Sequence, residues 1–302
     1  MRLTLLGTGS PLPSLTRAST GHLIEENNQK ILIDVGPGAV TRLLECGVQP
    51  TDIDNILLSH LHFDHVGDLA RTLFCCWDRF GGIRALPEII GPKGTRRMID
   101  KLFGPDGAFQ ADLTARTSHA RSLDIYLSRG GRLPRPWPNF AVTEIEGAGS
   151  FNLPDLQITY SPVQHHQPYL DSFSYRVEGK SGVVCYTSDI AIGRDPQYCD
   201  SLRTIASNVD VLVHYLNSFE FDAQDAASSK PILMGQLAND LNVRRLVTTH
   251  HGPAMDKPGV SDAVLNAVRS VYKGEIYWGV DKLTFDVKSH DDVSISIAPP
   301  RG

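Results

Sequence analysis

One short segment of the chain places three histidines and an aspartate within six residues. It runs from His60 to His65 and directly follows the apolar run Asn55–Ser59, which predicts a buried strand. Imidazole nitrogen together with carboxylate oxygen suits zinc, iron and manganese better than calcium or magnesium. The segment therefore predicts a metal site at the end of a strand. Its candidate ligands are His60, His62, Asp64 and His65.

The spacing of these four ligands favours two metals over one. In an extended segment His60 and His62 project to the same side, because side chains alternate with a period of two. Asp64 and His65 are adjacent and must diverge, so four ligands do not easily crowd one ion. The structural alternative is that Asp64 caps a helix from Val66 onward, which needs only one residue of the four. We expect two divalent metals, Zn²⁺ first, with iron or manganese as alternatives.

The rest of the chain alternates short strands with helices, which is typical of an α/β sandwich. At roughly 150 residues per domain, 302 residues allow one or two domains, and we expect a single one over 1–302. The sequence predicts strands at 3–5, 22–24, 30–34, 55–59, 140–145, 156–160, 173–177, 183–186, 209–214, 245–249 and 276–278, and helices at 39–46, 66–77, 231–241 and 261–271.

Composition narrows the class of protein. With 41% hydrophobic and 21% charged residues, the chain is not a disordered one. The apolar runs are far shorter than the ~20 residues of a membrane helix, and no signal-peptide core is visible, so we expect a cytoplasmic protein without membrane partners. The five cysteines lack a CxxC spacing, which disfavours disulfides and thiolate metal sites. The net charge of −5 disfavours a nucleic-acid binder.

Residues 104–140 differ in charge from the chain as a whole. They contain five arginines and only three aspartates, and the Gly- and Pro-rich run 130–138 fits neither a helix interior nor a central strand. We expect an ordered basic insertion or lid within the domain. Its arginines form a candidate clamp for an anionic ester, and the alternative is a solvated lid over Trp137. These arginines are Arg116, Arg121, Arg129, Arg132 and Arg135.

The segment His60-Leu61-His62-Phe63-Asp64-His65 resembles the HxHxDH signature of the metallo-β-lactamase superfamily. Met1–Gly9 is similar to the family's opening strand and glycine turn, and Ile31–Gly36 is similar to its second motif. The likeness is closest to the branch that holds ribonuclease Z and the arylsulfatase-like hydrolases. It implies an αββα sandwich of two mixed β-sheets flanked by helices, with a two-metal site along one edge. It also implies a homodimer.

The resemblance implies ligands for the first metal. His60 and His62 would bind it, together with a histidine from a later motif. In this branch that histidine lies nine residues before a strand tyrosine, a count that selects His166 ahead of Tyr175. The neighbouring His165 is the alternative.

The second metal would take its ligands from three motifs. Asp64 and His65 come from the signature, and His250 from the segment that ends Thr249-His250-His251-Gly252. His251 is the alternative to His250. The carboxylate that bridges the two metals would be Asp189.

Two further positions bear on this arrangement. Asp34 ends a predicted strand, where it either accepts a hydrogen bond behind a ligand histidine or serves as a turn residue before Gly36. Ser188 stands where the family has a glycine, directly before the expected bridging carboxylate. Two metals joined by a carboxylate would hold a bridging hydroxide that is nucleophilic at neutral pH, and Asp64 would orient it.

The resemblance to ribonuclease Z breaks at two positions. That branch carries a His-Glu pair at the end of a strand, whereas here His214 is followed by Tyr215. It also carries a histidine where this chain has Ser228. Both differences disfavour tRNA 3′ processing. His214 and Tyr215 remain candidate proton donors, and a buried core histidine is the alternative role for His214.

Together these features predict a metal-dependent hydrolase of an ester-type bond, with a phosphate or sulfate ester of a small molecule as its partner. Three alternatives remain open. They are a tRNA 3′-processing endonuclease, a lactone or carboxyl-ester hydrolase, and a metal-binding protein without catalysis. We expect nucleic acid to be the less suitable substrate.

Overall fold

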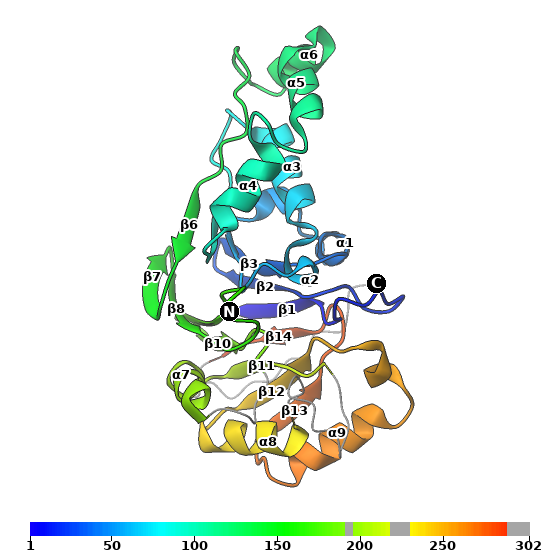
Figure 1. The fold of residues 1–302 in the computed structure, drawn as a ribbon, viewed down its shortest axis with the longest axis vertical. Coiled ribbons are helices and arrows are strands. Elements are labelled where there is room, and N and C mark those ends of the chain that lie inside the picture. The colour runs from blue at the N-terminus through cyan, green and yellow to red at the C-terminus, as the bar shows by residue number, and fades with distance from the viewer. Residues whose placement is uncertain (191–195, 218–229, 289–302) are drawn as a thin grey trace.

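The computed structural model describes residues 1–190, 196–217 and 230–288. Two seven-stranded sheets pack face to face, and helices cover the outer side of each sheet (Figure 1). This confirms the expected αββα sandwich. Within the described ranges no helix is both long enough and apolar enough to span a membrane.

The first sheet has the strand order β14-β1-β2-β3-β4-β5-β6. Strands β14 to β3 pair antiparallel, and β3 to β6 pair parallel. A parallel sheet needs crossovers, and helices supply them here. The strands are β1 Arg2–Gly7, β2 Gly21–Glu26, β3 Gln29–Val35, β4 Asn55–Leu57, β5 Glu88–Pro92, β6 Val142–Ile145 and β14 Thr284–Asp286.

The second sheet has the strand order β13-β12-β11-β10-β9-β8-β7. Strands β7 to β10 pair antiparallel, and β10 to β13 pair parallel. Both sheets are therefore mixed, as the resemblance implies. The strands are β7 Gly149–Leu153, β8 Leu156–Pro162, β9 Phe173–Gly179, β10 Gly182–Tyr186, β11 Val211–Tyr215, β12 Arg245–Thr249 and β13 Glu275–Trp278.

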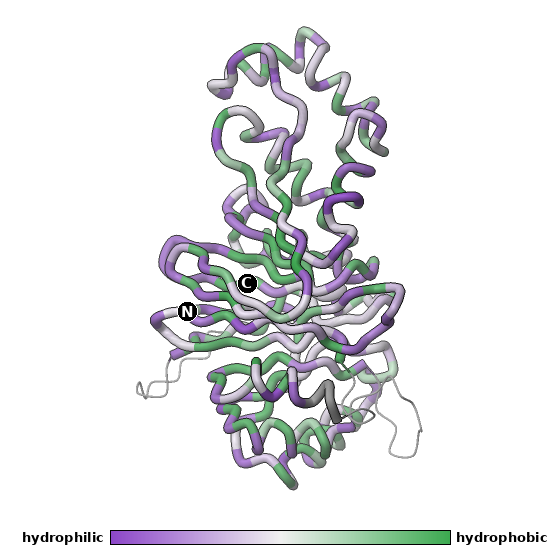
Figure 2. The backbone as a smooth tube through the Cα atoms, turned by 60° about the vertical axis from the view of Figure 1, so that its left-hand side comes forward, coloured by the Kyte–Doolittle hydropathy of each residue, from purple (hydrophilic) through white to green (hydrophobic). Residues whose placement is uncertain are grey.

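Apolar side chains fill three layers, one between the sheets and one under each group of helices. Figure 2 shows hydrophobic residues recurring along the strands in the middle of the molecule. The helix predicted at 66–77 is split, because the chain turns at Gly67 and Asp68. The helices are α1 Ala39–Glu45, α2 Phe63–Val66, α3 Leu69–Phe80, α4 Thr95–Phe103, α5 Gln110–Ser118, α6 Ala120–Ser128, α7 Pro196–Ala206, α8 Pro231–Asp240 and α9 Val260–Arg269, with 3₁₀ turns at Pro50–Asp52 and Pro253–Asp256.

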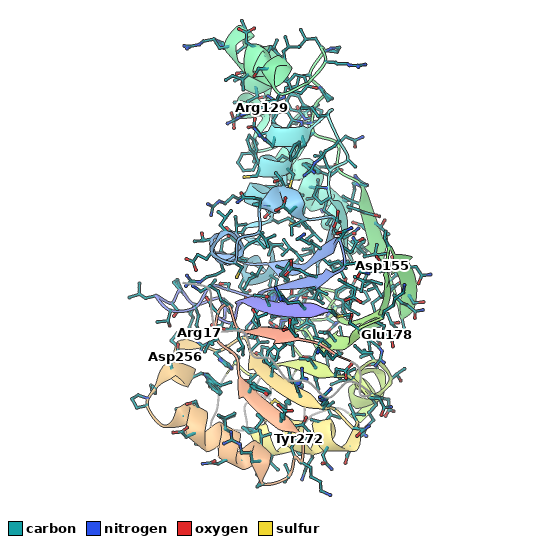
Figure 3. All side chains as sticks on the ribbon, turned by 180° about the vertical axis from the view of Figure 1, so that it is seen from behind. Arg17, Arg129, Asp155, Glu178, Asp256 and Tyr272 are labelled. Carbon is teal, nitrogen blue, oxygen red and sulfur yellow. The ribbon has the colours of Figure 1, made fainter. Side chains whose placement is uncertain are left out.

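The insertion at 104–140 forms an arm in which α5 and α6 project from the sandwich (Figure 1). The Gly- and Pro-rich run 130–138 contains no regular element, as expected. Asp78 of α3 holds the arm through Arg116, whose Nη1 lies 2.8 Å from its Oδ1, and through Arg129 and Arg135 at 3.3 and 3.1 Å. Arg129, which is part of the arm, is labelled in Figure 3. These three arginines stabilise the arm itself.

A loop after β1 is tied to the C-terminal part of the chain. Arg17 forms an ion pair with Asp256 at 2.9 Å, and the two labelled side chains lie together in Figure 3. The Arg17 guanidinium also donates to Thr8 Oγ1 at 2.6 Å. The carbonyl of Thr8 accepts from the backbone N–H of His251 at 2.7 Å, and Gly9 forms an isolated β-bridge with His251. These contacts position the loop after β12.

Candidate metal centre

Five strand ends supply the polar residues of the centre. Asp34 is the second-to-last residue of β3, and His60 follows β4 in the first sheet. Asp189 follows β10 and His250 follows β12 in the second sheet, with Tyr215 ending β11 between them. The carboxyl ends of parallel strands meet at one edge of a sheet, so the two sheets bring these side chains together.

The first cluster joins three histidines and a carboxylate. His62 Nδ1 lies 3.0 Å from His60 Nε2 and 3.2 Å from His165 Nε2. The Oδ2 atom of Asp189 lies 3.8 Å from Nε2 of each of these other two histidines. The four donor atoms therefore converge on one point.

The second cluster joins two histidines and two carboxylates, all buried. His250 Nε2 lies 3.0 Å from Asp64 Oδ2 and 2.9 Å from Asp189 Oδ2. His65 Nε2 lies 3.2 Å from Asp189 Oδ2 and 3.5 Å from Asp64 Oδ2. The same oxygen of Asp189 thus belongs to both clusters.

These spacings suit divalent metals. A tetrahedral ion with ligands at about 2.0–2.2 Å holds its donor atoms roughly 3.3–3.6 Å apart. The donor pairs given above lie at 2.9–3.8 Å, close to that separation, and all donor atoms of each cluster lie within 4.8 Å of one another. Every donor is an imidazole nitrogen or a carboxylate oxygen, the set that zinc, iron and manganese accept. Within the described ranges, buried Asp189 Oδ1 and His250 Nδ1 have no hydrogen-bond partner.

The histidines of the first cluster are kept neutral. Burial lowers the pKa of His60 well below its usual range, and the neighbouring His65 lowers it further. Burial also lowers the pKa of His62, and it lowers that of His165 to about 4. A neutral imidazole offers a lone pair, which a metal ligand requires.

In the second cluster the carboxylates are ionised and the histidines are protonated. Burial alone would raise the pKa of Asp64 and Asp189, but His65 and His250 hold both carboxyl pKa values below their usual range. Burial alone would lower the pKa of His250, yet Asp189 and Asp64 raise it to about 9, and Asp189 and Asp34 raise that of His65. Two ionised buried carboxylates need positive charge beside them. Either protonated histidines or a divalent metal can supply it.

The structure distinguishes the paired histidines that sequence counting left open. His165 lies in the first cluster, whereas His166 lies behind it, with Nδ1 3.0 Å from Nε2 of His62. Likewise His250 faces the second cluster, while His251 turns away and stacks on Trp278 at 4.0 Å. The rings of His165 and His166 stack at 4.2 Å, yet only His165 of that pair, and only His250 of the other, belongs to a donor cluster.

Asp34 supports both clusters from behind. Its Oδ2 lies 2.7 Å from Nδ1 of His65 and accepts from Ser59 Oγ at 2.7 Å. Ser59 Oγ in turn lies 2.9 Å from Nδ1 of His60, and Tyr186 donates to Asp34 at 3.2 Å. These contacts turn the Nε2 lone pairs of both histidines inward. Sequence reasoning missed Ser59 and Tyr186, although Ser59 directly precedes the histidine segment.

Three residues of the centre adopt left-handed backbone conformations, namely Asp34 at φ 58°, Ser188 at φ 57° and His250 at φ 63°. Such values favour glycine, and for other residues they cost on the order of 1–2 kcal/mol. Ser188 stands where the resemblance implies a glycine, and the torsion gives the physical reason for a glycine there. Backbone strain concentrated at one edge is typical of a functional site.

The two candidate proton donors of β11 face opposite sides of the sheet. His214 is wholly buried, with Nδ1 2.8 Å from the carbonyl of Tyr215, and burial lowers its pKa to about 4. Its Nε2 has no hydrogen-bond partner in the part of the chain that the structure describes. The Tyr215 ring lies 4.8 Å from that of His250. Tyr215 therefore faces the metal centre, and His214 does not.

The candidate arginine clamp lies away from the centre. Arg116, Arg129 and Arg135 of the candidate clamp bind Asp78 and hold the arm, so their guanidiniums are engaged there. Figure 1 shows α5 and α6 at the far end of the molecule from β11 to β13. Ser228 lies outside the described residues.

The chain is similar to known proteins over most of its length. Residues 1–91 match the family described as Anti-Pycsar protein Apyc1. Ribonuclease Z of Mycobacterium bovis is 27% identical over 299 residues, which cover 93% of this chain and 96% of the relative. Ribonuclease Z of Mycobacterium marinum is 30% identical over 217 residues, which cover 71% of this chain and 70% of the relative.

Solved structures show the same fold at lower identity. The metallo-β-lactamase fold protein YhfI of Bacillus subtilis has a TM-score of 0.70 at 18% identity, covering 94% of this chain and 99% of that one. The short form of human tRNase Z has a TM-score of 0.64 at 19% identity, covering 95% and 99%. At these identities the likeness establishes the fold alone.

Proposed function

Because the chain belongs to the ribonuclease Z family of metallo-β-lactamase-fold hydrolases, we propose that it is an endoribonuclease that removes the 3′ extension of tRNA precursors. The chain is a metal-dependent hydrolase. One observation carries the proposal, namely that a single oxygen of Asp189 lies in both ligand clusters. Paired metal sites that share a carboxylate are typical of enzymes that hydrolyse phosphodiesters.

This proposal corrects the expectation of a small-molecule ester as substrate with nucleic acid disfavoured. That expectation is wrong, because relatives named ribonuclease Z align with 93% of the chain. It rested partly on the net charge of −5, which averages over the whole surface. Contacts to phosphate depend on local potential instead, so an acidic protein can still present a basic groove.

We propose one divalent ion in each cluster, zinc first. His60, His62 and His165 would hold one ion, Asp64, His65 and His250 the other, and Asp189 both. Such ions supply Lewis-acid polarisation of a phosphoryl oxygen and lower the pKa of a water.

The chain's own residues then have distinct tasks. Asp34 holds the proton on Nδ1 of His65, so that Nε2 stays available as a ligand. Asp64 remains ionised because His250 and His65 lower its pKa. Its carboxylate can then accept a hydrogen bond from a water and orient that water for attack. His166 stands behind His62 and fixes the orientation of that ring. Each task depends on a contact to a ligand histidine.

Tyr215 is our candidate for protonating the leaving oxygen. Its ring lies against ligand His250, while the neighbouring His214 faces the other side of the sheet and is wholly buried. The phenol would replace the glutamate of the His-Glu pair that the resemblance implies at this position. A phenolic O–H is a weaker acid than an imidazolium, so we expect slow turnover of substrates with poor leaving groups.

The test compares one RNA substrate with one generic phosphodiester. Purified protein, loaded with Zn²⁺ or Mn²⁺, is incubated with a tRNA precursor that carries a 3′ extension and, separately, with bis(p-nitrophenyl) phosphate. We expect cleavage at the 3′ end of the tRNA, lost with a chelator and with Asp189→Asn. Asp262→Asn, on exposed α9, serves as the matched control.

Two results separate the possibilities. Turnover of bis(p-nitrophenyl) phosphate without any cleavage of the precursor would leave the metal centre intact and refute the RNA substrate. Cleavage that survives both the chelator and Asp189→Asn would refute the metal-dependent mechanism.

A further inference from the structure

An open groove of about 950 Å³ adjoins the ligand loops. One wall is the segment 168–171, which begins two residues after the 165–166 histidine pair, and Leu61, between His60 and His62, also lines the groove. The other wall is α4 and the residues before it. The groove therefore lies beside the segments that carry the first ligand cluster.

Three cations line the α4 wall at intervals of four residues. Lys93, Arg97 and Lys101 are exposed, and none has an ion-pair partner within the described ranges. Residues four apart lie on one face of a helix, with Arg97 and Lys101 displaced by about 6 Å along its axis. Their charges form a row that runs along the groove.

Two of the other four charged residues of the groove are engaged elsewhere. Arg96 donates to the carbonyls of Phe140 and Val142. The carboxylate of Glu144 accepts from the backbone N–H groups of Gly94 and Arg96, so the start of α4 is already capped. Exposed Asp100 and Asp171 complete the charged lining. Four basic and three acidic side chains leave the groove positive in a protein whose net charge is −5.

An aromatic side chain stands free on the opposite wall. Tyr169 is 93% exposed, although its backbone N–H is anchored at 3.1 Å to the carbonyl of His166. Its ring is left in solvent, where it gains nothing from packing. In nucleic-acid grooves such rings stack on unpaired bases.

We propose that this groove holds a single-stranded stretch of the RNA substrate, with its phosphates along Lys93, Arg97 and Lys101 and one base stacked on Tyr169. The inference rests on the proposed function, because it names where the RNA lies relative to the metal centre. A positive groove combined with an exposed aromatic is the usual architecture of sequence-independent single-strand binding. The contacts are to backbone and ring faces, so we expect little base preference.

The test measures binding of a fluorescently labelled, unstructured 12-nucleotide RNA by anisotropy at several salt concentrations. The groove variant is Arg97→Ala with Lys101→Ala. The control is Arg269→Ala with Lys273→Ala, a second exposed pair four residues apart, at α9 on the opposite side of the molecule (Figure 1). We expect about tenfold weaker binding for the groove variant only, and a salt slope smaller by about 1.4.

A second pair of variants tests the stacking. Tyr169→Leu is expected to weaken binding of the single strand about tenfold, whereas Tyr169→Phe keeps the ring and retains the affinity. Turnover of bis(p-nitrophenyl) phosphate verifies that the metal centre is unchanged in all four variants. Equal affinity and salt slope in groove and control variants would overturn the inference.

The outcomes separate this inference from the function on which it rests. RNA cleavage by the wild type with no effect of the groove variants overturns the groove alone. RNA binding that the groove variants weaken, without any cleavage by the wild type, overturns the proposed function and supports the groove. Failure of the wild type to bind the RNA overturns the groove.

Discussion

The carboxylate of Asp34 lies 2.7 Å from Nδ1 of His65, and both side chains are fully buried. The two residues come from different elements, Asp34 from β3 and His65 from α2, and the parallel pairing of β3 with β4, which precedes α2, brings them together. A carboxylate in this position fixes the tautomer of a ligand histidine and raises its basicity. The orientation of His65 in the second cluster therefore depends on a residue that is not itself a ligand.

Asp34→Asn is expected to weaken metal binding by about 10–100-fold. Asparagine tolerates the left-handed backbone at this position, so the loss would come from the hydrogen bond and not from the fold. Competition with a metallochromic chelator measures the affinity. Equal affinities for Asp34→Asn and the exposed control Asp262→Asn would contradict the role of Asp34.

His165→Ala and His166→Ala are expected to differ in metal content. Removing His165 takes a donor from the first cluster, so the protein should keep one tightly bound ion. Removing His166 leaves all donors and only loosens His62, so two ions should remain, with lower affinity for one. Elemental analysis after dialysis measures the stoichiometry. The reverse pattern would assign the ligand role to His166.

Metal binding is expected to release protons and to strengthen as the pH rises toward 9. In the metal-free protein, Asp189 and its neighbours outweigh the effect of burial, raising the pKa of His250 to about 9 and that of His65 well above its usual range. Both imidazoles therefore carry protons at pH 7 that a metal must displace. Calorimetric titration in two buffers of different ionisation enthalpy gives the number released. No proton release at pH 7 would contradict these charge states.

Ser188→Gly is expected to be more stable than Ser188→Ala by about 1 kcal/mol. Both variants lose the contact of the hydroxyl with Ser172 at 3.2 Å, but only glycine relieves the left-handed torsion of 57°. Urea unfolding of the two variants measures the difference in the free energy of unfolding. Equal stability would show that the loop before Asp189 carries no strain.

Tyr215→Phe is expected to lower kcat on the RNA substrate by about a hundredfold and to leave bis(p-nitrophenyl) phosphate almost unaffected. The ribose oxygen needs a proton as it departs, whereas p-nitrophenolate does not. His214→Asn should alter neither rate by more than a few-fold, because that side chain faces the helices. Equal losses on both substrates would indicate a structural role for Tyr215.

Local patterns were enough to predict much of the fold. The alternation of apolar residues located β1 to β4 and β8 to β13, because a strand buries every second or every residue over a short stretch. Helices α5 and α6 were not predicted. Each buries only one large side chain, Leu113 in α5 and Tyr126 in α6, so the apolar residues show little helical periodicity. Strand β5, with α4 after it, was also missed.

The sequence by itself singled out the candidate ligands His60, His62, Asp64 and His65, because all four lie within six residues of one segment. Only the tertiary structure placed His165 and not His166, and His250 and not His251, in the donor clusters, and only it showed what Asp34 contacts. Those answers depend on which way a side chain points across a gap between two sheets. That direction is set by strand pairing and packing far along the chain, which spacing in the sequence does not encode.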